Sequence, residues 1–344
     1  MQLTLRPQNR VLPILPNRPV LESALLARVN LPHSCKGGNC GSCRARLISG
    51  EVHYPRGRTL GLTDAEVAAG DVLLCQAVPL GDLVVEAHEI RRVGDVEIKS
   101  LPCRVDRLEL LAPDVMALYL RLPAVEDFRF QPGQYLDMML PEGQRRSFSI
   151  ASAPHEASQL ELHVRRVSGG VFTERVFTSM RAGELLRIEG PLGHFVYRDD
   201  PNPNRHDPLI LVAGGTGFAP IKAILRHLLE TGVKRPVRLY WGARHEVDLY
   251  ADGWVRERVA RFPEFSYVPV LSDATSDEAR RYRSGWVHEA VLADGPDLSN
   301  AEVYAAGPPA LVTALRDSLI ARGLPRDRLY FDSFDYAPAV RAGS

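Results

Sequence analysis

Alternation between apolar and polar residues divides the chain into three stretches of different character. In the first stretch, short alternating segments such as residues 1–7 and 81–90 predict strands, and residues 19–30 predict a helix. Residues 62–75 predict a second short helix that begins at a Thr or Asp cap. Strands, a helix and a connecting loop together indicate a small α+β unit over residues 1–93.

The second stretch, residues 100–200, repeats short strand-like segments that are separated by glycine- and proline-containing turns. These segments lie at residues 103–111, 115–122, 134–140, 146–152, 160–167 and 184–190. Repeated short strands with such turns are typical of an antiparallel barrel. A polar, proline-bearing segment at residues 198–207 predicts the linker that ends this stretch.

The third stretch alternates apolar strands with amphipathic helices. Residues 209–215 predict a buried strand, and residues 218–232 predict the helix that follows it and ends at Gly232. Strand–helix alternation of this kind indicates a doubly wound parallel sheet. We therefore predict a multidomain protein of α+β and α/β classes, with domains at residues 1–93, 100–200 and 207–344.

Composition and charge refine this picture by exclusion. Lys and Arg number 42, as do Asp and Glu, so the formal net charge is zero, whereas a general nucleic-acid binder would carry a basic excess. No apolar run reaches the roughly 18 residues that a membrane-spanning helix needs. Residues 1–20 lack the features of a signal peptide. We expect a cytoplasmic protein with neither a nucleic acid nor a membrane as its partner.

Four of the five cysteines form the most specific motif in the sequence. Cys35, Cys40 and Cys43 are spaced C-x4-C-x2-C, and Cys75 follows far downstream. This spacing is typical of plant-type [2Fe–2S] ferredoxins, in which three thiolates come from one loop and the fourth from a distant position. Zinc ribbons favour paired C-x2-C knuckles, so structural zinc is the weaker alternative. Cys103 lies outside the motif, and we expect it to be a buried apolar residue of a strand.

The loop around these cysteines is rich in glycine. Gly37, Gly38 and Gly41 allow unusual backbone conformations, so that backbone N–H groups can turn toward the sulfurs of a cluster. A protein partner that accepts electrons would meet the surface near this loop, around Lys36, Asn39 and Arg44.

A second motif, Arg146-Ser147-Phe148-Ser149, lies in a predicted strand of the second stretch. It resembles the Arg-x-(Tyr/Phe)-(Ser/Thr) motif of the ferredoxin–NADP reductase superfamily. A guanidinium can grip phosphate oxygens through two donors, and one flat ring can pack against another. The resemblance implies that Arg146 and Ser147 belong to an FAD site, where Arg146 pairs with the pyrophosphate and Phe148 packs against the isoalloxazine. It also implies that Ser149 hydrogen-bonds near flavin N5, which receives hydride, and makes Ser149 a catalytic candidate.

The same resemblance extends to the next predicted strand and the turn after it. In the superfamily this strand lines the flavin, and a Gly-x-x-(Ser/Thr) turn binds pyrophosphate at the start of a helix. Two of the strand residues, His163 and Arg165, can also be interpreted as solvated. The cofactor-binding candidates implied here are His163, Val164, Arg165, Gly170, Val171 and Thr173.

Two further motifs concern the nicotinamide coenzyme. Gly214-Gly215-Thr216-Gly217 departs from the strict G-x-G-x-x-G fingerprint, but a glycine turn between strand and helix lets a pyrophosphate approach the helix N-terminus. In the superfamily, Gly-Gly-x-Gly-x-(Ala/Thr)-Pro is the pyridine-nucleotide loop, and Pro220 completes it. Gly307 and Pro308 resemble the Cys-Gly-Pro-Pro segment that borders the nicotinamide, although Ala306 replaces its cysteine.

Taken in order, the motifs resemble a three-module NAD(P)H-dependent reductase with an N-terminal ferredoxin domain. The resemblance implies a β-grasp ferredoxin, an antiparallel FAD barrel and a doubly wound nucleotide domain, with a [2Fe–2S] cluster, FAD and NADH or NADPH as cofactors. A nicotinamide gives up two electrons as hydride whereas the cluster accepts one at a time, so the flavin is the converter between them. Phe334 stands where family members keep a ring next to the flavin, which makes it the second catalytic candidate; it can also be interpreted as a core aromatic.

The resemblance implies a protein electron acceptor, either an oxygenase component or a deoxysugar dehydrase. Residues 145–154, 160–170 and 185–195 are most similar to reductases of the CDP-6-deoxyglucoseen class. Arg244 could accommodate the 2′-phosphate of NADPH, yet the surrounding segment also occurs in NADH-dependent members, so NADH is favoured. We expect a monomer. Two alternatives stay open: a non-catalytic redox-sensing or electron-relay subunit, and a structural zinc protein with a flavin-like barrel.

Overall fold

The computed structural model describes residues 1–344 with the exception of 28, 30, 35, 40, 58, 60, 88–95, 125–126, 142–143, 200–206, 233 and 335–344. The described chain forms two compact units. The first takes in the described residues of Met1–Asp95 and of Phe331–Asp335, and the second takes in those of Val96–Tyr330.

The first unit is built on a five-stranded sheet in the order β2-β1-β7-β3-β5. β1 runs parallel to β7, whereas the pairs β1–β2, β3–β5 and β3–β7 are antiparallel. Helix α1 (Val20–Leu26) shares one hydrophobic core with the fully buried Leu3 and Leu5 of β1. A helix packed with a mixed sheet is the expected β-grasp arrangement. The strands are β1 (Gln2–Arg6), β2 (Arg10–Pro13), β3 (Arg44–Ser49), β5 (Asp71–Leu73) and β7 (Leu83–Glu86), with a separate pair of β4 (Val52–His53) and β6 (Val78–Pro79).

The predicted helix over residues 62–75 is wrong in its second half. Helix α2 covers only Asp64–Ala68, where Thr63 and Glu66 form a capping box: Thr63 N donates to Glu66 Oε2 at 2.8 Å and Glu66 N donates to Thr63 Oγ1 at 3.3 Å. Gly70 has a φ of 86°, a left-handed conformation that ends a helix. The apolar residues that follow belong to β5, where their side chains are buried in the hydrophobic core of the first unit.

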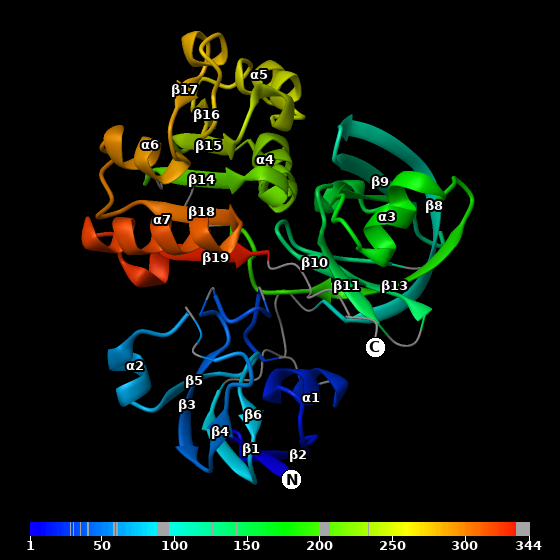
Figure 1. Cartoon of the computed structure of the whole chain (residues 1–344), viewed down its shortest axis with the longest axis vertical. Helices are drawn as coiled ribbons and strands as arrows, with labels where there is room; N and C mark the ends of the chain where they lie inside the picture. The colour runs from blue at the N-terminus through cyan, green and yellow to red at the C-terminus, as the bar shows by residue number, and fades with distance from the viewer. Residues whose placement is uncertain are drawn as a thin grey trace. The chain divides into compact units, whose positions relative to one another are not determined.

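The second unit begins with a six-stranded antiparallel sheet in the order β11-β10-β13-β8-β9-β12, which we call the barrel (Figure 1). Ile150, directly after β11, bridges to Leu162 of β12, and this bridge closes the sheet on itself. Cys103 is buried in the barrel core, as predicted. The barrel elements are β8 (Lys99–Ala112), β9 (Val115–Arg121), β10 (Tyr135–Met139), β11 (Arg145–Ser149), β12 (Gln159–Arg165), α3 (Val171–Thr178) and β13 (Leu185–Leu192).

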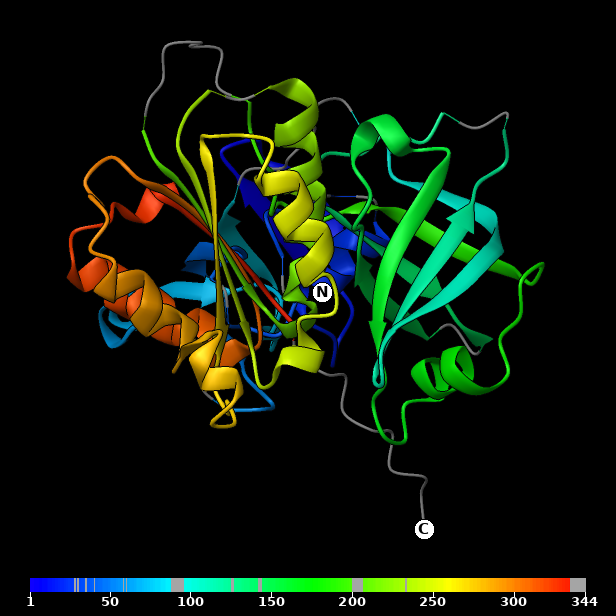
Figure 2. The same ribbon diagram turned by 90° about the horizontal axis from the view of Figure 1, so that it is seen from above.

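The remainder of the second unit, which we call the nucleotide lobe, is a doubly wound sheet in the order β17-β16-β15-β14-β18-β19, and the last strand continues into the Phe331–Asp335 segment of the first unit. The strand pairs from β17 to β18 are parallel. Helices α4 and α5 cover one face and α6 and α7 the other (Figure 2). Helix α4 ends at Gly232 with a φ of 69°, as predicted. The lobe's elements are β14 (Leu209–Gly214), α4 (Phe218–Thr231), β15 (Val237–Ala243), α5 (Asp252–Val259), β16 (Phe265–Leu271), β17 (Arg283–Ser284), α6 (Val287–Ala293), β18 (Glu302–Gly307), α7 (Pro309–Ala321) and β19 (Leu329–Ser333).

The sheets confirm the predicted fold classes of all three parts of the chain. Among the described residues, none of the helices has both the length and the apolar character that crossing a membrane requires.

Candidate functional site

Two of the four predicted cluster ligands lie in the described residues and are close neighbours in the fold. Cys43 precedes β3 and Cys75 follows β5, and these two strands pair with one another. Leu74 N donates to the carbonyl of Cys43 at 3.1 Å. Both cysteines are buried, with 2% and 4% exposed surface, and neither forms a disulfide. Cys35 and Cys40 lie outside the described residues, so the four-cysteine set stays a prediction.

The loop of residues 34–43 has a backbone that depends on glycine. Gly38 and Gly41 have φ values of 82° and 75°, in the left-handed region. A Cβ on Gly38 would lie 2.8 Å from the Cγ of Gln76, whose Nε2 donates to the carbonyl of Lys36 at 2.6 Å. Two buried thiols thus lie beside a tightly turned loop, an arrangement that is suited to an iron–sulfur cluster held by thiolates.

Other side chains of this loop have fixed partners. The hydroxyl of Ser34 donates to Asp332 Oδ1 at 2.6 Å, and both residues are buried; Asp332 belongs to the segment that completes the first unit. Arg44 forms an ion pair with Glu66. The expectation that Asn39 lies on the partner surface is wrong, because only 8% of its surface is exposed.

The predicted flavin motif lies on β11. The half-buried ring of Phe148 has its centroid 5.3 Å from that of Phe172, in the first turn of α3. Arg146 donates from a terminal nitrogen to the carbonyl of the preceding residue at 2.9 Å, and Ser147 Oγ donates to a β10 carboxylate at 2.5 Å. Ser149 is buried at the end of the strand. Strand β11 therefore carries the guanidinium of Arg146, the ring of Phe148 and the hydroxyl of Ser149. The roles of these groups in binding FAD stay predictions.

The turn before α3 is held by a side-chain hydroxyl. Thr173 Oγ1 lies 3.1 Å from the carbonyl oxygen of Gly170 and accepts the N–H of Val167 at 3.2 Å. A Cβ on Gly170 would approach this hydroxyl to 2.5 Å, so the turn requires glycine. Val171, the first helical residue, is 77% exposed. An ordered and solvent-facing helix start is compatible with the pyrophosphate role that the resemblance implies.

Strand β12 separates its side chains by face. Val164 is fully buried with its apolar neighbours in the barrel core, so it could offer a flavin only its backbone. Glu161, His163 and Arg165 extend from the opposite face and contact the nucleotide lobe. His163 is only 6% exposed, which contradicts its interpretation as a solvated residue.

His163 uses both ring nitrogens, one toward the nucleotide lobe and the other toward its own strand. Nδ1 lies 2.9 Å from the hydroxyl of Tyr250, and Nε2 lies 2.9 Å from Glu161 Oε1. Burial lowers the pKa of His163 and raises the pKa of Tyr250 well above its usual range. The ring is therefore neutral at physiological pH, accepts from the phenol and donates to the carboxylate.

Glu161 is ionised despite its burial. Burial alone would raise the pKa of Glu161, but the hydrogen bond from His163 and the charge of Lys222, with Nζ 2.6 Å from Oε1, outweigh it and hold the pKa at about 2. Arg226 adds a contact of 3.3 Å to the other carboxylate oxygen. A carboxylate thus stands between two cations at the junction of barrel and nucleotide lobe.

The glycine turn after β14 is in contact with the end of β18. A Cβ on Gly217 would lie 2.1 Å from the carbonyl oxygen of Ala306, and one on Gly307 would lie 3.1 Å from the Cα of Gly214. Gly215 has a φ of 53°, in the left-handed region. The two predicted coenzyme motifs therefore pack backbone against backbone at the carboxyl edge of the parallel strands, where nucleotides usually bind.

Arginines from both parts of the second unit lie beside this turn. Arg165 places a terminal nitrogen 3.0 Å from where a Cβ on Gly215 would be, and its Nε pairs with Asp114 at 3.1 Å. Arg244, the predicted 2′-phosphate candidate, donates to both oxygens of the buried Asp248 at 2.9 and 3.1 Å. The charge of Arg244 is therefore already matched within the protein.

The remaining candidates have defined places. Thr216 lies in a single 3₁₀ turn, Gly215–Gly217, and Pro308 is the N-cap of α7. Phe334 directly follows β19, is half-buried and belongs to the first unit. Its contact with a flavin stays a prediction.

Sequence reasoning missed four residues of the junction: Glu161, Lys222, Tyr250 and Asp248. A signal was present, since polar residues alternate with fully apolar ones along β12. That alternation marks a face outside the barrel core, but it does not tell whether water or another part of the chain covers the face.

Comparison with protein families accounts for three successive parts of the chain. Residues 3–80 match the 2Fe-2S iron-sulfur cluster binding domain, residues 102–197 the oxidoreductase FAD-binding domain, and residues 211–317 the oxidoreductase NAD-binding domain.

Whole-length relatives agree with these matches. The CDP-6-deoxy-L-threo-D-glycero-4-hexulose-3-dehydrase reductase of Yersinia pestis is 39% identical over 315 residues, which are 92% of each chain. Reductase component 1 of terephthalate 1,2-dioxygenase from Comamonas sp is 33% identical and covers 98% of each chain. The crystal structure of the Amycolatopsis cytochrome P450 reductase GcoB matches 97% of this chain and 98% of its own, with 34% identity and a TM-score of 0.76.

These similarities confirm the predicted cofactor set and favour the reductase over the sensor and zinc alternatives. The chain belongs to the family of NAD(P)H-dependent reductases in which a [2Fe–2S] ferredoxin domain precedes FAD- and NAD-binding domains, and it is an oxidoreductase that passes electrons from NAD(P)H through FAD and the cluster to a protein acceptor.

Proposed function

We propose that this reductase takes its electrons from NADH and delivers them to a dehydrase that acts on a nucleotide-linked 6-deoxyhexulose. The observation that supports the choice of coenzyme is the pair between Arg244 and Asp248. An NADPH-dependent enzyme needs a cation for the 2′-phosphate, whereas Arg244 is engaged by both oxygens of a buried carboxylate. A 2′-phosphate that approached Arg244 would meet the negative charge of Asp248, whereas the neutral 2′-hydroxyl of NADH would not be repelled.

The proposed acceptor is supported by the relatives. The Yersinia pestis protein, at 39% identity, is named as the reductase of a CDP-linked hexulose dehydrase, while the Comamonas protein, at 33%, is named for a dioxygenase. An oxygenase component is the alternative that the experiment below distinguishes.

The flavin would be held by the barrel. FAD, when bound, supplies the conversion of one hydride into two single electrons. Arg146 would bind pyrophosphate oxygens through its guanidinium, together with the N–H groups of residues 170–173. Phe148 would pack against the ring system, and the hydroxyl of Ser149 would hydrogen-bond beside the reacting edge. Phe334 would provide a second aromatic ring next to the flavin.

The coenzyme would be held by the carboxyl edge of the nucleotide lobe. The three glycines of residues 214–217, together with Gly307, carry no Cβ, so a pyrophosphate could lie close to the backbone N–H groups of this turn. Arg165 extends from β12 to within reach of Gly215. We therefore assign its guanidinium to the coenzyme phosphates rather than to the flavin. The four cysteines, Cys35, Cys40, Cys43 and Cys75, would hold the cluster.

Anaerobic reduction of the purified holoprotein tests the coenzyme. We expect NADH to bleach the flavin with a kcat/KM at least about tenfold above that of NADPH, a difference of roughly 1.4 kcal/mol. Equal efficiency with NADPH would contradict the argument from Arg244 and Asp248. A preparation without flavin, or one that neither coenzyme reduces, would overturn the proposed function as a whole.

Reconstitution with two acceptors tests the partner. The purified reductase is mixed, with NADH, either with a hexulose dehydrase and its substrate or with a dioxygenase component. Turnover only with the dehydrase supports the proposal, and turnover only with the oxygenase refutes it. We further propose a cytoplasmic monomer, which cell fractionation and light scattering would test.

A further inference from the structure

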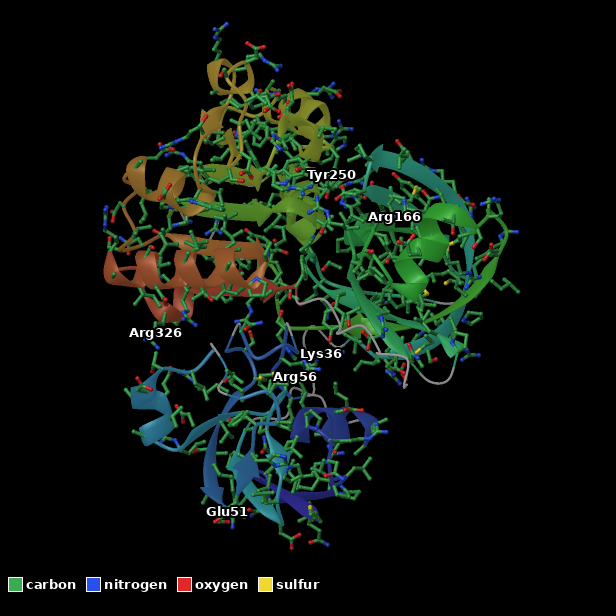
Figure 3. The ribbon with its side chains drawn as sticks, in the orientation of Figure 1. Lys36, Glu51, Arg56, Arg166, Tyr250 and Arg326 are labelled. Carbon is green, nitrogen blue, oxygen red and sulfur yellow. The ribbon has the colours of Figure 1, made fainter. Side chains whose placement is uncertain are left out.

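Alternate side chains of β12 form a row of polar contacts between the barrel and the nucleotide lobe. Glu161 contacts Lys222 of α4 at 2.6 Å, and His163 contacts Tyr250 at 2.9 Å. Figure 3 labels Tyr250 on the nucleotide lobe and Arg166, the residue after β12, on the barrel. No motif discussed above requires these contacts, and the reaction as proposed assigns no role to Glu161 or Lys222.

The strongest contact in the row is the ion pair between Glu161 and Lys222. Glu161 is 3% exposed and Lys222 is 7% exposed, so water barely screens their interaction. Arg226 approaches the second carboxylate oxygen at 3.3 Å and also pairs with Glu156 of the barrel. Oppositely charged groups thus hold the barrel and the nucleotide lobe together at this point of the junction.

The pair connects the two backbone segments that matter most for hydride transfer. Lys222 lies in the first turns of α4, which follows directly on the coenzyme turn Gly215–Gly217. On the barrel side, the carbonyl of Glu161 accepts the N–H of Ala151 at 2.7 Å, two residues beyond Ser149. A displacement at this pair would therefore reach one predicted binding segment along the backbone of α4 and the other through this backbone hydrogen bond.

Aromatic rings meet elsewhere across this junction, with centroids 6.5 Å apart for His163 and Phe218 and 5.7 Å apart for Phe195 and Tyr304, but packing is interrupted beside the ion pair. A cavity of about 760 Å³ lies beside the pair, lined by residues of both parts that include Arg107, Tyr119, His155 and Trp254. Because the walls of a cavity can approach or separate without overlap, the direct contacts across the junction must define the distance between barrel and lobe.

We propose that Glu161 and Lys222 are positioning residues that set the distance between the flavin-holding strand and the coenzyme-holding turn, and with it the rate of hydride transfer. This inference rests on the proposed function. The two residues act through the backbone segments they connect, and neither needs to touch the flavin or the coenzyme.

The experiment compares Glu161→Gln, Lys222→Met and the double variant Glu161→Gln/Lys222→Met with the wild-type holoprotein. The single variants leave one buried charge with fewer partners, whereas the double variant removes both charges and restores most of the stability. Three quantities are measured: the rate of flavin bleaching at saturating NADH under anaerobic stopped flow, the long-wavelength charge-transfer absorbance of the nicotinamide–flavin complex, and the midpoint of thermal unfolding.

A matched control separates positioning from stability. Arg235 and Glu302 form a second buried ion pair, at 2.7 Å, inside the nucleotide lobe. Glu302 is the first residue of β18, at the opposite edge of the sheet from the coenzyme turn. Glu302→Gln should therefore lower the thermal midpoint without altering the geometry at the turn.

We expect flavin bleaching to slow at least about tenfold in the single variants and to stay slow in the double variant, with a weaker charge-transfer band in all three. Lys222→Arg, which keeps the charge, should recover most of the rate and provides a second test if a single variant does not fold. Glu302→Gln should bleach within about twofold of the wild-type rate. A double variant with the wild-type rate and charge-transfer band would overturn the inference, as would an equal loss of rate in Glu302→Gln. If NADH does not reduce the wild-type flavin, the proposed function fails instead.

Discussion

Replacing Gly217 by alanine should block the coenzyme while leaving the flavin and the cluster in place. The backbone of Gly217 has φ −57° and ψ −12°, a conformation that alanine adopts readily, so the effect is purely steric. The added Cβ would lie 2.1 Å from the carbonyl oxygen of Ala306 and 2.8 Å from the Cα of Gly307. Both neighbours are backbone atoms and cannot rotate away.

The size of the effect follows from this contact. Moving from 2.1 Å to an ordinary contact of 3.4 Å requires a separation of about 1.3 Å between the turn and β18. Overpacking of this kind costs roughly 1–3 kcal/mol of stability, and a misplacement near 1 Å can slow a reaction about a hundredfold. We therefore expect Gly217→Ala to lose about two orders of magnitude in the rate of flavin reduction by NADH.

Anaerobic stopped flow measures that rate, and the flavin content together with dithionite reduction of the cluster shows that the other sites are intact. Gly253→Ala is the matched control: a Cβ there meets nothing within 4 Å, and the residue lies in α5. Alanine should stabilise this helix by roughly 0.5–1 kcal/mol without changing the rate. If Gly217→Ala reduces its flavin at the wild-type rate, the turn and the end of β18 do not form the coenzyme surface.

Three further predictions follow from the ionised and cysteine side chains. Asp248→Asn should release Arg244 and raise kcat/KM for NADPH several-fold while that for NADH changes less, as steady-state kinetics with both coenzymes would show. The pKa of Glu161 is lowered from 4.5 to about 2 in the folded protein, so its ionisation contributes about 3 kcal/mol to the free energy of unfolding above pH 4.5, and this contribution is lost as the pH falls toward 2. The difference in the free energy of unfolding between the wild type and Glu161→Gln should therefore shrink over the same pH range. A difference that stays constant with pH would contradict the assignment. Cys43→Ser should abolish the electron paramagnetic resonance signal of the reduced cluster and electron delivery to the acceptor, yet retain NADH-dependent reduction of ferricyanide by the flavin.

The parts of the fold that were predictable depend on local physical chemistry. The end of α4 at Gly232 follows from a residue that tolerates the left-handed conformation, and the buried β14 follows from a run of apolar side chains. The predicted helix over residues 62–75 is too long, because an amphipathic segment of this length is compatible with both helix and strand. Burial of β5 in the sheet decides between them, and that depends on strands far away in the sequence.

The candidate site shows the same limit. Local motifs indicate which residues can bind a phosphate or a flavin, since the chemistry resides in a few adjacent side chains. The partners of Glu161 and Arg244 could not be predicted in this way. The sequence does not show whether a charged side chain lies in water or in a buried ion pair. Asn39 shows a related error: a polar residue in a loop is expected to be exposed, but the fold buries this side chain.

The hydrogen bond from Ser34 to Asp332 has a consequence for the order in which the protein is completed during synthesis. The first unit is discontinuous, because its last segment, Phe331–Asp335, follows the whole sequence of the second unit. At the usual 5–20 residues per second, that intervening sequence takes roughly 10 to 50 s to synthesise. Ser34, the residue before Cys35, therefore gains its buried partner only after Asp332 has been synthesised, and a chain cut at Tyr330 never gains it. The loop that carries three of the predicted cluster ligands is thus among the last parts of the first unit to be finished, although its own sequence leaves the ribosome first.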